Sequence, residues 1–463
     1  MTRHTSATFF EIFAELRANL RTVEATPIEV SLLLIHTVHR FQDHYRDLGI
    51  ELPEDAASDL QRLDLPLPRV AELVEAILGP RVDASFEVLG RPDVDAAVVA
   101  RASRQVGLHV AQLGKNTRDA LAAIGETCTH RLDYGVRQFP LGSGVVQTPG
   151  TLARLTAEVL DAQPEMTVLD PNVGLARTLV ELARRQAAAG GDSNALRYVG
   201  QEIEDQTALL GAMHLVLNGV TNFVIHVGDT LASPATEPET FDRVIADPPI
   251  GLTVPHLLGA LEGDRRFVFG HKALPKAADW LFLQHGLTSL KPGGRAVFVT
   301  AHGPLFRGGS EGSIRQDLLA TGWLSDVVAL PSALYPNTAL PLVLTVFDRP
   351  RAGELGRDDV LMIDASDLGV REGRIQVLGE EARTTLLTLL RERQGNTDIA
   401  VLVGHDRIHA NKDAWQPNQY LTRPEKTGRD LSAIREDLQG ALERLRVAER
   451  RVAEAFDELV ERR

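Results

Sequence analysis

The sequence predicts an α/β protein with a mostly parallel sheet, an all-helical N-terminal domain and a C-terminal helix like that of a coiled coil. Three observations support this fold class. Apolar residues recur every three or four positions in residues 1–138, and short apolar runs alternate with amphipathic segments in residues 139–400. A seven-residue repeat runs through residues 430–463. The predicted domains are therefore 1–138, 139–400 and a C-terminal segment, 401–463, that ends in this helix.

Composition narrows the class of protein before any motif is considered. The 463 residues are 44% hydrophobic, which is enough for two or three domains with real cores. The single cysteine, Cys128, excludes an intrachain disulfide framework. The N-terminus lacks a signal-peptide core, and apolar runs such as residues 30–35 are too short to span a membrane. We expect a cytoplasmic protein that does not contact a membrane.

The net charge of −14 bears on which partners are expected. A stand-alone nucleic-acid binder gains its affinity by neutralising phosphates, so this charge argues against one. It leaves open a subunit that reaches DNA through a local basic surface or through a partner protein.

The N-terminal domain reads as a series of helices without a motif for chemistry. FFEIFAELRANLRTVE and PRVAELVEAIL are amphipathic at helical spacing, and breaks at Pro53 and Pro66–Pro68 separate the helices. An accessory domain is expected here.

The central domain shows the alternation of strands and helices that is typical of a parallel sheet covered on both faces. In such sheets, ligands bind at the carboxyl ends of the strands. Helices are predicted over 175–189 and 205–218. The polar stretch 395–421 follows this domain without a predicted element. The predicted strands are 166–170, 196–202, 223–229, 241–249, 295–301, 324–331, 342–348 and 360–366.

The C-terminal helix carries two apolar series, each spaced by seven residues. The second series is mostly alanine, so the helices along such a seam would lie close together. A helix that pairs with another chain is favoured over one that docks on its own domain, because the seam is long and terminal. The series are Leu431, Leu438, Leu445, Val452, Leu459 and Ile434, Ala441, Ala448, Ala455.

Acids at three successive strand ends indicate a nucleoside cofactor. Asp170 ends the first strand before a turn at Gly174, where the missing side chain permits a close backbone approach. Glu202 ends the second strand and is suited to ribose hydroxyls, and Asp229 ends the third and is suited to an adenine amine. Neither a GxGxxG motif nor a phosphate-binding lysine is present, so S-adenosylmethionine, with its positive sulfonium, fits better than NAD or ATP. The alternative is that these acids cap turns and helices.

The segment Asp247-Pro248-Pro249-Ile250 follows the next strand and suggests methyl transfer to an amine. Two prolines stiffen the loop, so a backbone carbonyl and the aspartate can accept both N–H bonds of one exocyclic amine. The amine lone pair is then less conjugated with its ring and can attack a methyl group. A base in duplex DNA would have to be flipped out, and Ile250 would cover it by apolar contact instead of stacking. The alternative is an Asp-Pro-Pro turn of purely structural use.

The order of these motifs resembles the modification (methyltransferase) subunit of type I restriction–modification systems, in the adenine-N6 DNA methylase family. The resemblance covers about residues 140–350, with an echo at 405–422. It rests on QTPGTLARLTAEVL, VLDPNVGLARTLV, GQEIEDQTALLGAMHLVLNGV, GDTL, DPPI, ADWLFLQHGLTSLKPGGRAVFVTAHGPLFRGGSEGSIRQDLL and VVALPSALYPNTALPLVLTVF.

The resemblance implies a Rossmann-like, class I S-adenosylmethionine-dependent methyltransferase sheet and an adenine-specific, site-specific DNA methyltransferase. It implies that Thr148 and Pro149 lie beside the methionine end of the cofactor. The remaining implied cofactor residues are Asp170, Pro171, Gly174, Glu202, Asp229 and Thr230, and the implied catalytic residues are Asp247, Pro248, Pro249 and Ile250; a metal is not expected.

Four positions depart from the family's pattern. Ala176 stands where glycine is expected, Leu175 replaces a small residue, and His214 stands where asparagine is common. Side chains at 175 or 176 can crowd the approach of the cofactor. The catalytic tetrapeptide is usually NPPF or NPPY in this subfamily and DPPY in related adenine methylases, so Ile250 is not an ordinary substitute.

Three hypotheses follow from these observations. The first is an adenine DNA methyltransferase that acts with a separate specificity subunit, and with a nuclease subunit as a further partner, because the residues after 350 leave no room for a target-recognition domain. The second is a binding module that keeps the fold and the partner helix but not turnover. The third is a methyltransferase whose acceptor is a protein amide or a small molecule.

Overall fold

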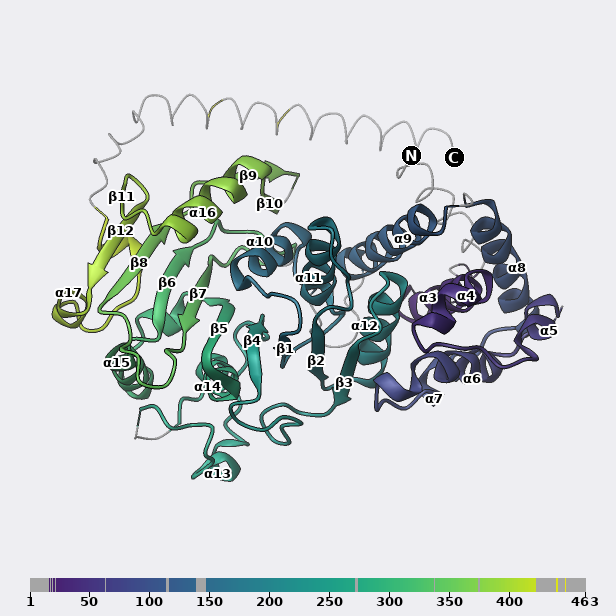
Figure 1. Ribbon diagram of the computed structural model, residues 1–463, viewed down its shortest axis with the longest axis horizontal. Coiled ribbons are helices and arrows are strands. Elements are labelled where there is room, and N and C mark those ends of the chain that lie inside the picture. The colour runs from purple at the N-terminus through teal and green to yellow at the C-terminus, as the bar shows by residue number, and fades with distance from the viewer. Residues whose placement is uncertain are drawn as a thin grey trace. The chain divides into compact units, whose positions relative to one another are not determined.

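The computed structural model describes residues 16, 18, 20, 22–62, 64–113, 116–138, 147–270, 274–336, 338–373, 375–421, 439 and 446 (Figure 1). By its internal contacts the chain divides into two units, Met1–Tyr420 and Leu421–Arg463. The predicted coiled-coil helix, 430–463, lies outside the described residues except at positions 439 and 446.

The N-terminal part of the first unit is helical, as predicted. The predicted break at Pro66–Pro68 is confirmed: Pro66 caps α6, and Pro68 occupies the first turn, where its missing N–H costs nothing. Pro53 lies in the loop between two helices. The helices are α3 (Thr22–Arg40), α4 (Gln42–Asp47), α5 (Ala56–Gln61), α6 (Leu67–Leu78), α7 (Glu87–Gly90), α8 (Ala96–Gln112) and α9 (Thr117–Gln138), with the 3-10 turn η1 (Gly79–Arg81) after α6.

The central domain is built on a ten-stranded sheet with the order β11-β12-β8-β6-β7-β5-β4-β1-β2-β3. Strands β9 (Gly369–Glu372) and β10 (Ile375–Leu378) form a separate hairpin. The ten strands are β1 (Thr167–Asp170), β2 (Arg197–Glu202), β3 (Phe223–Val227), β4 (Phe241–Ala246), β5 (Leu290–Ala301), β6 (Leu324–Ala329), β7 (Leu342–Asp348), β8 (Asp359–Asp364), β11 (Asn396–Thr397) and β12 (Ala400–Gly404).

Strand direction decides where a ligand can bind. Strands β3, β2, β1, β4 and β5 are parallel neighbours, and β7 runs antiparallel between β5 and β6. The chain moves outward from β1 to β3 on one side and returns to β4 on the other. The carboxyl ends of β1 and β4 therefore form a topological switch point, where open α/β sheets bind ligands.

The polar stretch 395–421 contains elements that its composition did not predict. Strand β12 pairs with β8 over five residue pairs, and β11 continues the sheet beyond it. Helix α17 (His405–Ala410) and the 3-10 turn η3 (Pro417–Gln419) follow. A short strand next to an existing edge gains its stability from pairing, which local composition does not report. Because β12 crosses residue 400, the boundary between the second and third domains stays a prediction.

Helices cover both faces of the sheet, and the period-two alternation of the strands separates the two cores. Val168 and Tyr198 belong to one core with α10 (Gly150–Leu160), α11 (Arg177–Ala188), α12 (Asp205–Leu217) and α16 (Glu380–Glu392). Their neighbours Leu169 and Val199 belong to the other core with α14 (Asp279–Ser289) and α15 (Ser310–Thr321). The predicted doubly covered sheet is confirmed. The short helix α13 (Leu258–Leu261) and the turn η2 (Gly303–Leu305) lie in connections.

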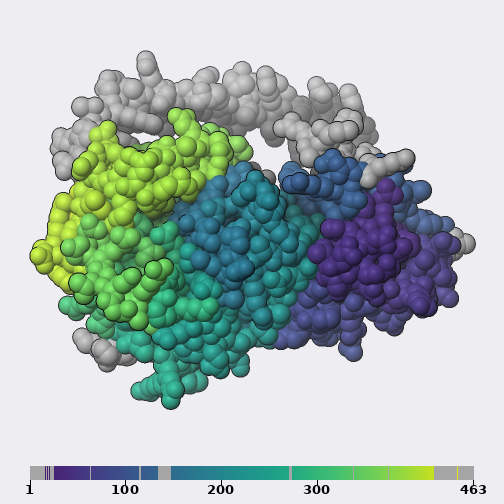
Figure 2. All heavy atoms as spheres, in the orientation of Figure 1, coloured from purple at the N-terminus to yellow at the C-terminus, as the bar shows by residue number. Residues whose placement is uncertain are grey.

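The N-terminal helices pack against α12 and the β3 edge. Helices α3 and α9 both contact α12, and η1 contacts β3. In Figure 2 the purple and blue atoms of these helices lie directly against the teal atoms of the sheet domain. Every residue of α12 from Thr207 to Leu217 is buried, as expected of a helix held between a sheet and a second layer of helices. Within the described residues, no helix is both long and apolar enough to cross a membrane.

Candidate functional site

Four of the predicted acids lie along one edge of the sheet. Asp170 and Glu202 are the last residues of β1 and β2, Asp247 directly follows β4, and Asp229 comes two residues after β3. Since the strand order here is β4-β1-β2-β3, the acids follow one another as Asp247, Asp170, Glu202 and Asp229. The sheet thus brings together side chains that are up to 77 residues apart in the sequence.

The turn after β1 leaves open space beside Gly174. Gly174 has a φ of +51°, and a Cβ added there would find only the Asn172 carbonyl oxygen, at 3.9 Å. The Gly174 N–H donates to Glu202 Oε2 at 3.1 Å, and the Asn172 N–H donates to Asp170 Oδ1 at 3.1 Å. The strand-end acids therefore shape the turn, and the missing side chain leaves space beside it.

Leu175 and Ala176 do not point into that space. Both side chains are buried in the core on the α11 and α12 side of the sheet. Ala176 adopts the left-handed conformation, with φ 57° and ψ 27°, which costs a residue with a Cβ about 1–2 kcal/mol relative to glycine. The departure from the glycine pattern therefore costs backbone strain, and the expected crowding of a ligand does not follow from these side-chain positions.

Helix α12 supports this turn from behind through His214. The His214 ring bridges the Leu175 carbonyl at 2.8 Å and the Thr129 hydroxyl of α9, also at 2.8 Å. Burial lowers the pKa of His214 to about 3, so the ring is neutral and has one donor and one acceptor nitrogen for the two contacts. The helical domain is thereby connected to the turn after β1, a role that a histidine inside a helix does not reveal in the sequence.

The acids at the second and third strand ends also hold backbone groups. Glu202 Oε1 accepts the N–H groups of Ile203 and Glu204, and Asp229 Oδ1 accepts those of Leu231 and Ala232. A carboxylate has about four acceptor positions, so each of the two acids retains capacity for a ligand.

Two neighbours of these acids have different surroundings. The Thr230 hydroxyl donates to the Pro171 carbonyl at 2.6 Å, so it ties the third strand end to the turn after β1. Ile203, directly after Glu202, is 59% exposed. The sequence reading did not select Ile203, although its position after the second acid was visible.

Asp247 is held by two hydroxyl groups from distant parts of the chain. Thr148 donates to Asp247 Oδ2 at 2.6 Å, and the Tyr335 hydroxyl donates to the same oxygen. The predicted segment Thr148–Pro149, at the start of α10, therefore does meet the Asp-Pro-Pro-Ile loop. Tyr335 lies in the loop between β6 and β7 and was not selected as a site residue, although it stands in VVALPSALYPNTALPLVLTVF, one of the segments that carry the family resemblance.

The rest of this loop differs in exposure. Pro248 is buried and Pro249 is exposed. Ile250 is partly buried and packs against the core, so its side chain is not fully free to cover a ligand.

The electrostatics of the edge favour a positively charged ligand. Burial raises the pKa of Asp170 to about 8, and the nearby Asp247 and Glu202 add to this shift. Burial also raises the pKa of Glu202 and brings that of Asp247 to about 6, although the Thr148 and Tyr335 hydroxyls pull the latter down. When several buried acids lie close together, a bound cation stabilises their ionised form.

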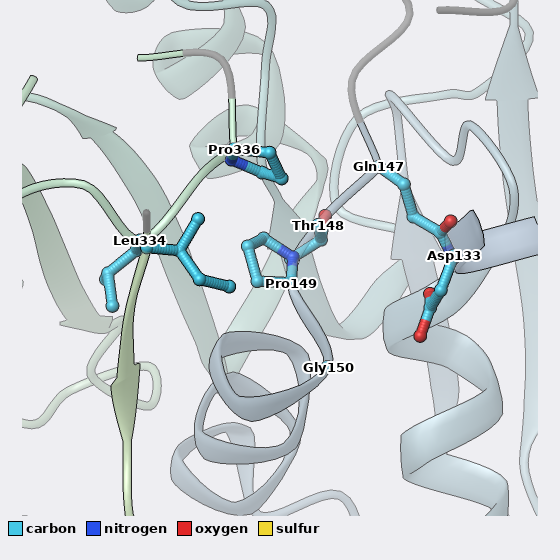
Figure 3. Close-up of a pocket in the computed structure, with 8 residues that line it drawn as sticks. Asp133, Gln147, Thr148, Pro149, Gly150, Leu334 and Pro336 are labelled. Carbon is cyan, nitrogen blue, oxygen red and sulfur yellow. The ribbon is translucent and has the colours of Figure 1, made fainter. Parts of the chain in front are cut away.

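A small, open pocket lies beside Thr148. Figure 3 shows Thr148 and Pro149 between Leu334 and Pro336 on one side and Gln147 and Asp133 on the other. Both polar atoms of the Gln147 amide are buried without a hydrogen-bond partner among the described residues, so a polar ligand group would satisfy them. Within the same part of the chain, no cluster of His, Cys, Asp or Glu has the arrangement of a metal site.

Comparison with known proteins places this geometry in context. A model of the N-6 DNA methylase family matches residues 134–428. The chain is 27% identical over 350 residues to the methylase subunit of the type I restriction enzyme MjaVII from Methanocaldococcus jannaschii, which covers 73% of this chain and 58% of that protein. It is 28% identical over 228 residues to the EcoKI methylase subunit from Escherichia coli, with 46% and 41% covered. The chain spans about half the length of these curated relatives.

Solved structures share the fold. The methyltransferase subunit of a type I restriction-modification system from Streptococcus thermophilus superposes with a TM-score of 0.75 at 20% identity, covering 91% of this chain and all of that one. A chain from another type I system gives a TM-score of 0.67 at 19% identity, with 98% of both chains covered. The predicted fold class, a class I methyltransferase sheet with a helical N-terminal region, is confirmed.

Proposed function

The chain belongs to the N-6 DNA methylase family, and from this premise we propose that it is an S-adenosylmethionine-dependent methyltransferase that modifies the exocyclic amine of adenine in DNA. One observation carries the proposal. An ordered row of acids lies at the carboxyl edge of the sheet, and it ends in an Asp-Pro-Pro loop whose aspartate is fixed by two hydroxyl groups. Such a row suits a cationic nucleoside beside an amine acceptor.

The residues present fit S-adenosylmethionine. The open face at Gly174 gives room for the nucleoside, and the buried Asn172 Oδ1 has no partner among the described side chains and backbone. Glu202, which has one acceptor position left on Oε2, would accept a ribose hydroxyl, and Asp229 would accept the adenine amine, while the exposed Ile203 would cover the adenine face.

The methionine end of the cofactor would lie on the other side of the site. Thr148 and Pro149 would border it, and the unpartnered Gln147 amide would contact its polar groups. When bound, S-adenosylmethionine would supply a methyl group on a positively charged sulfur, and the sulfur would keep the electron pair of the broken S–C bond and leave as a neutral thioether.

The chain's own residues prepare the acceptor. Asp247 and the Pro248 carbonyl each accept one N–H bond of the adenine amine, which frees the nitrogen lone pair for attack. Once the N–C bond has formed, the amine nitrogen is positively charged and must lose one proton. The Asp247 carboxylate, which is hydrogen-bonded to that N–H, would accept the proton. Because burial raises the pKa of Asp247 to about 6, this carboxylate is a better proton acceptor than an exposed aspartate. Ile250 would touch the flipped base by apolar contact only.

Partners complete the proposal. The chain carries a net charge of −14, which disfavours direct binding to the phosphates of DNA. We therefore propose that a separate specificity subunit holds the DNA. The helix predicted over 430–463 would pair with that subunit, and a nuclease subunit would join the assembly. We propose that this assembly acts in the cytoplasm.

Mapping of 6-methyladenine in genomic DNA tests the function directly. Cells with the gene should carry methylated adenines in one sequence motif, and deletion of the gene should remove that motif. Complementation with the intact gene should restore it, and complementation with Asp247→Ala should not. Identical maps with and without the gene would favour the other two hypotheses, a binding module or a different acceptor.

The affinity for S-adenosylmethionine should rise with pH between about 6 and 8. The folded-state pKa of Asp170 is raised to about 8, so this carboxyl is mostly protonated at pH 6, and a cation must displace its proton in order to bind. Affinity should therefore increase by up to about tenfold per pH unit while one proton is released, and should level off above about pH 8.

Calorimetry in two buffers of different ionisation enthalpy measures both the affinity and the released proton. S-adenosylhomocysteine is the matched ligand control, because it has the same nucleoside and amino-acid ends but no charge on sulfur. Its affinity should change much less over the same range. Equal pH dependence for the two ligands would show that the acids do not interact with the positive charge of the sulfonium.

A further inference from the structure

Asp247 receives both hydroxyl hydrogen bonds on a single oxygen. Thr148 and Tyr335 are 187 residues apart in the sequence, and both donate to Oδ2. Tyr335 is only 3% exposed and its ring belongs to the core, so its hydroxyl is held in place by packing. We name these two hydroxyls on Asp247 Oδ2 the donor clamp.

The donor clamp leaves only one oxygen of Asp247 for a further hydrogen bond. Each carboxylate oxygen accepts about two hydrogen bonds, so two hydroxyl donors fill Oδ2. A further donor must then use Oδ1. We propose that the donor clamp orients Asp247 so that Oδ1 alone meets the acceptor amine, which makes Tyr335 a positioning residue for methyl transfer. The identity of the acceptor rests on the proposed function, but the clamp itself does not.

The clamp also favours a carboxylate over an amide at position 247. An asparagine whose oxygen took the two hydroxyl bonds would present its NH₂ group to the acceptor amine, so that donor would face donor. The Tyr335 hydroxyl remains a donor at any working pH, because burial and the neighbouring Asp247 raise the pKa of Tyr335 well above its usual value.

The donor clamp opposes the rise in the pKa of Asp247 that burial causes. Asp170 on β1 is the adjacent acid, and Glu202 on β2 lies beyond it, so the described titratable groups nearest on the sheet are carboxyl groups, of which Asp170 is mostly protonated below about pH 8. Burial raises the pKa of Asp247 from 3.8 to about 6, and the hydroxyls of Thr148 and Tyr335 both lower it. Loss of one hydroxyl should raise that pKa further, by about one unit, because hydrogen bonds to charged groups are stronger than those to neutral ones.

Unfolding as a function of pH tests the clamp without any substrate. Since the folded-state pKa of Asp247 lies above its unfolded value, rising pH destabilises the fold until this pKa is passed. That loss should end near pH 6 in the native chain and about one unit higher in Tyr335→Phe. The unfolding equilibrium constant of Tyr335→Phe, divided by that of the native chain, measures how much stability the variant has lost. This ratio should therefore grow by about tenfold between pH 5.5 and 8.5.

Tyr198→Phe is the matched control for this measurement. Tyr198 is also a fully buried tyrosine, but its hydroxyl donates to the neutral Ser193 carbonyl at 3.1 Å. Its loss of stability should be the same at both pH values. If Tyr335→Phe does not fold, Thr148→Val removes the other hydroxyl and should show the same growth with pH. A loss of stability independent of pH in the folded clamp variants would overturn the proposal.

The pH profile of methyl transfer gives the second readout. Under single-turnover conditions with DNA, the acid limb of the rate should move upward by about one pH unit in Tyr335→Phe, while Tyr198→Phe keeps the native profile. An unshifted acid limb would refute the positioning role. If the native chain methylates no DNA, the proposed function fails, and the unfolding experiment still decides whether the clamp exists.

Discussion

Replacement of Asp247 by alanine should lower the rate of methyl transfer to DNA by at least about 10³-fold. Removal of one fixed hydrogen-bond partner from a reacting group typically costs about 10²–10³-fold, and Asp247 also receives the proton that the amine must lose. The measurement is a single-turnover reaction with isotopically labelled methyl groups, using DNA that contains the methylated motif found by genomic mapping.

Two controls make this result specific to the active site. The variant should still bind S-adenosylmethionine, because the turn at Gly174 and the carboxylate of Glu202 are intact. Asp93→Ala, which removes an exposed acid from the helical domain, should transfer methyl groups at the native rate. If Asp247→Ala retained more than a tenth of the native rate, the Asp-Pro-Pro loop would not be the site of transfer.

The strands could be predicted because burial on both faces makes them continuous apolar runs. The runs at 166–170, 196–202 and 342–348 match β1, β2 and β7 to within one residue at each end. The hairpin of β9 and β10 and the strand β12, next to the edge strand β11, were not predicted. Their residues are mostly exposed or intermediate, and the choice of a pairing partner depends on the tertiary structure.

The site was predictable to the extent that its residues end strands. Asp170, Glu202 and Asp247 were found because an acid after an apolar run is visible in the sequence, and parallel topology then brings them together. Tyr335 was not selected, and His214 was noted only as a departure from the family's pattern, because the contacts of both side chains are with groups far away in the chain. The sequence places Tyr335 in a loop and His214 inside a helix, and neither position shows which group the side chain contacts.

Replacement of Gly211 by alanine should weaken both the fold and the binding of the cofactor. Gly211 lies inside α12, where alanine is ordinarily the better helix former. Here a Cβ would lie 2.7 Å from the Gly174 carbonyl oxygen, a backbone atom of the turn after β1. Either α12 or the turn must move, so the free energy of unfolding should fall by about 1–3 kcal/mol, as for other overpacked sites.

Denaturant unfolding and calorimetry with S-adenosylmethionine measure the two effects of this variant. Gly312→Ala is the matched control, since Gly312 lies in helix α15 and a Cβ there would meet no atom closer than 3.7 Å. It should leave stability unchanged or raise it by up to about 1 kcal/mol, with native cofactor affinity.

The affinity of Gly211→Ala for S-adenosylmethionine tests whether the helical domain shapes the cofactor site. The N-terminal helices α3 and α9 hold α12, and α12 holds the turn through Gly211 and through the bridge from His214 to Leu175. If the turn is positioned in this way, the variant should bind S-adenosylmethionine at least about tenfold more weakly, because the open face at Gly174 would shift relative to Glu202. Native affinity in a destabilised Gly211→Ala would instead mean that the turn is held by the sheet alone, and that the helical domain contributes stability but does not shape the site.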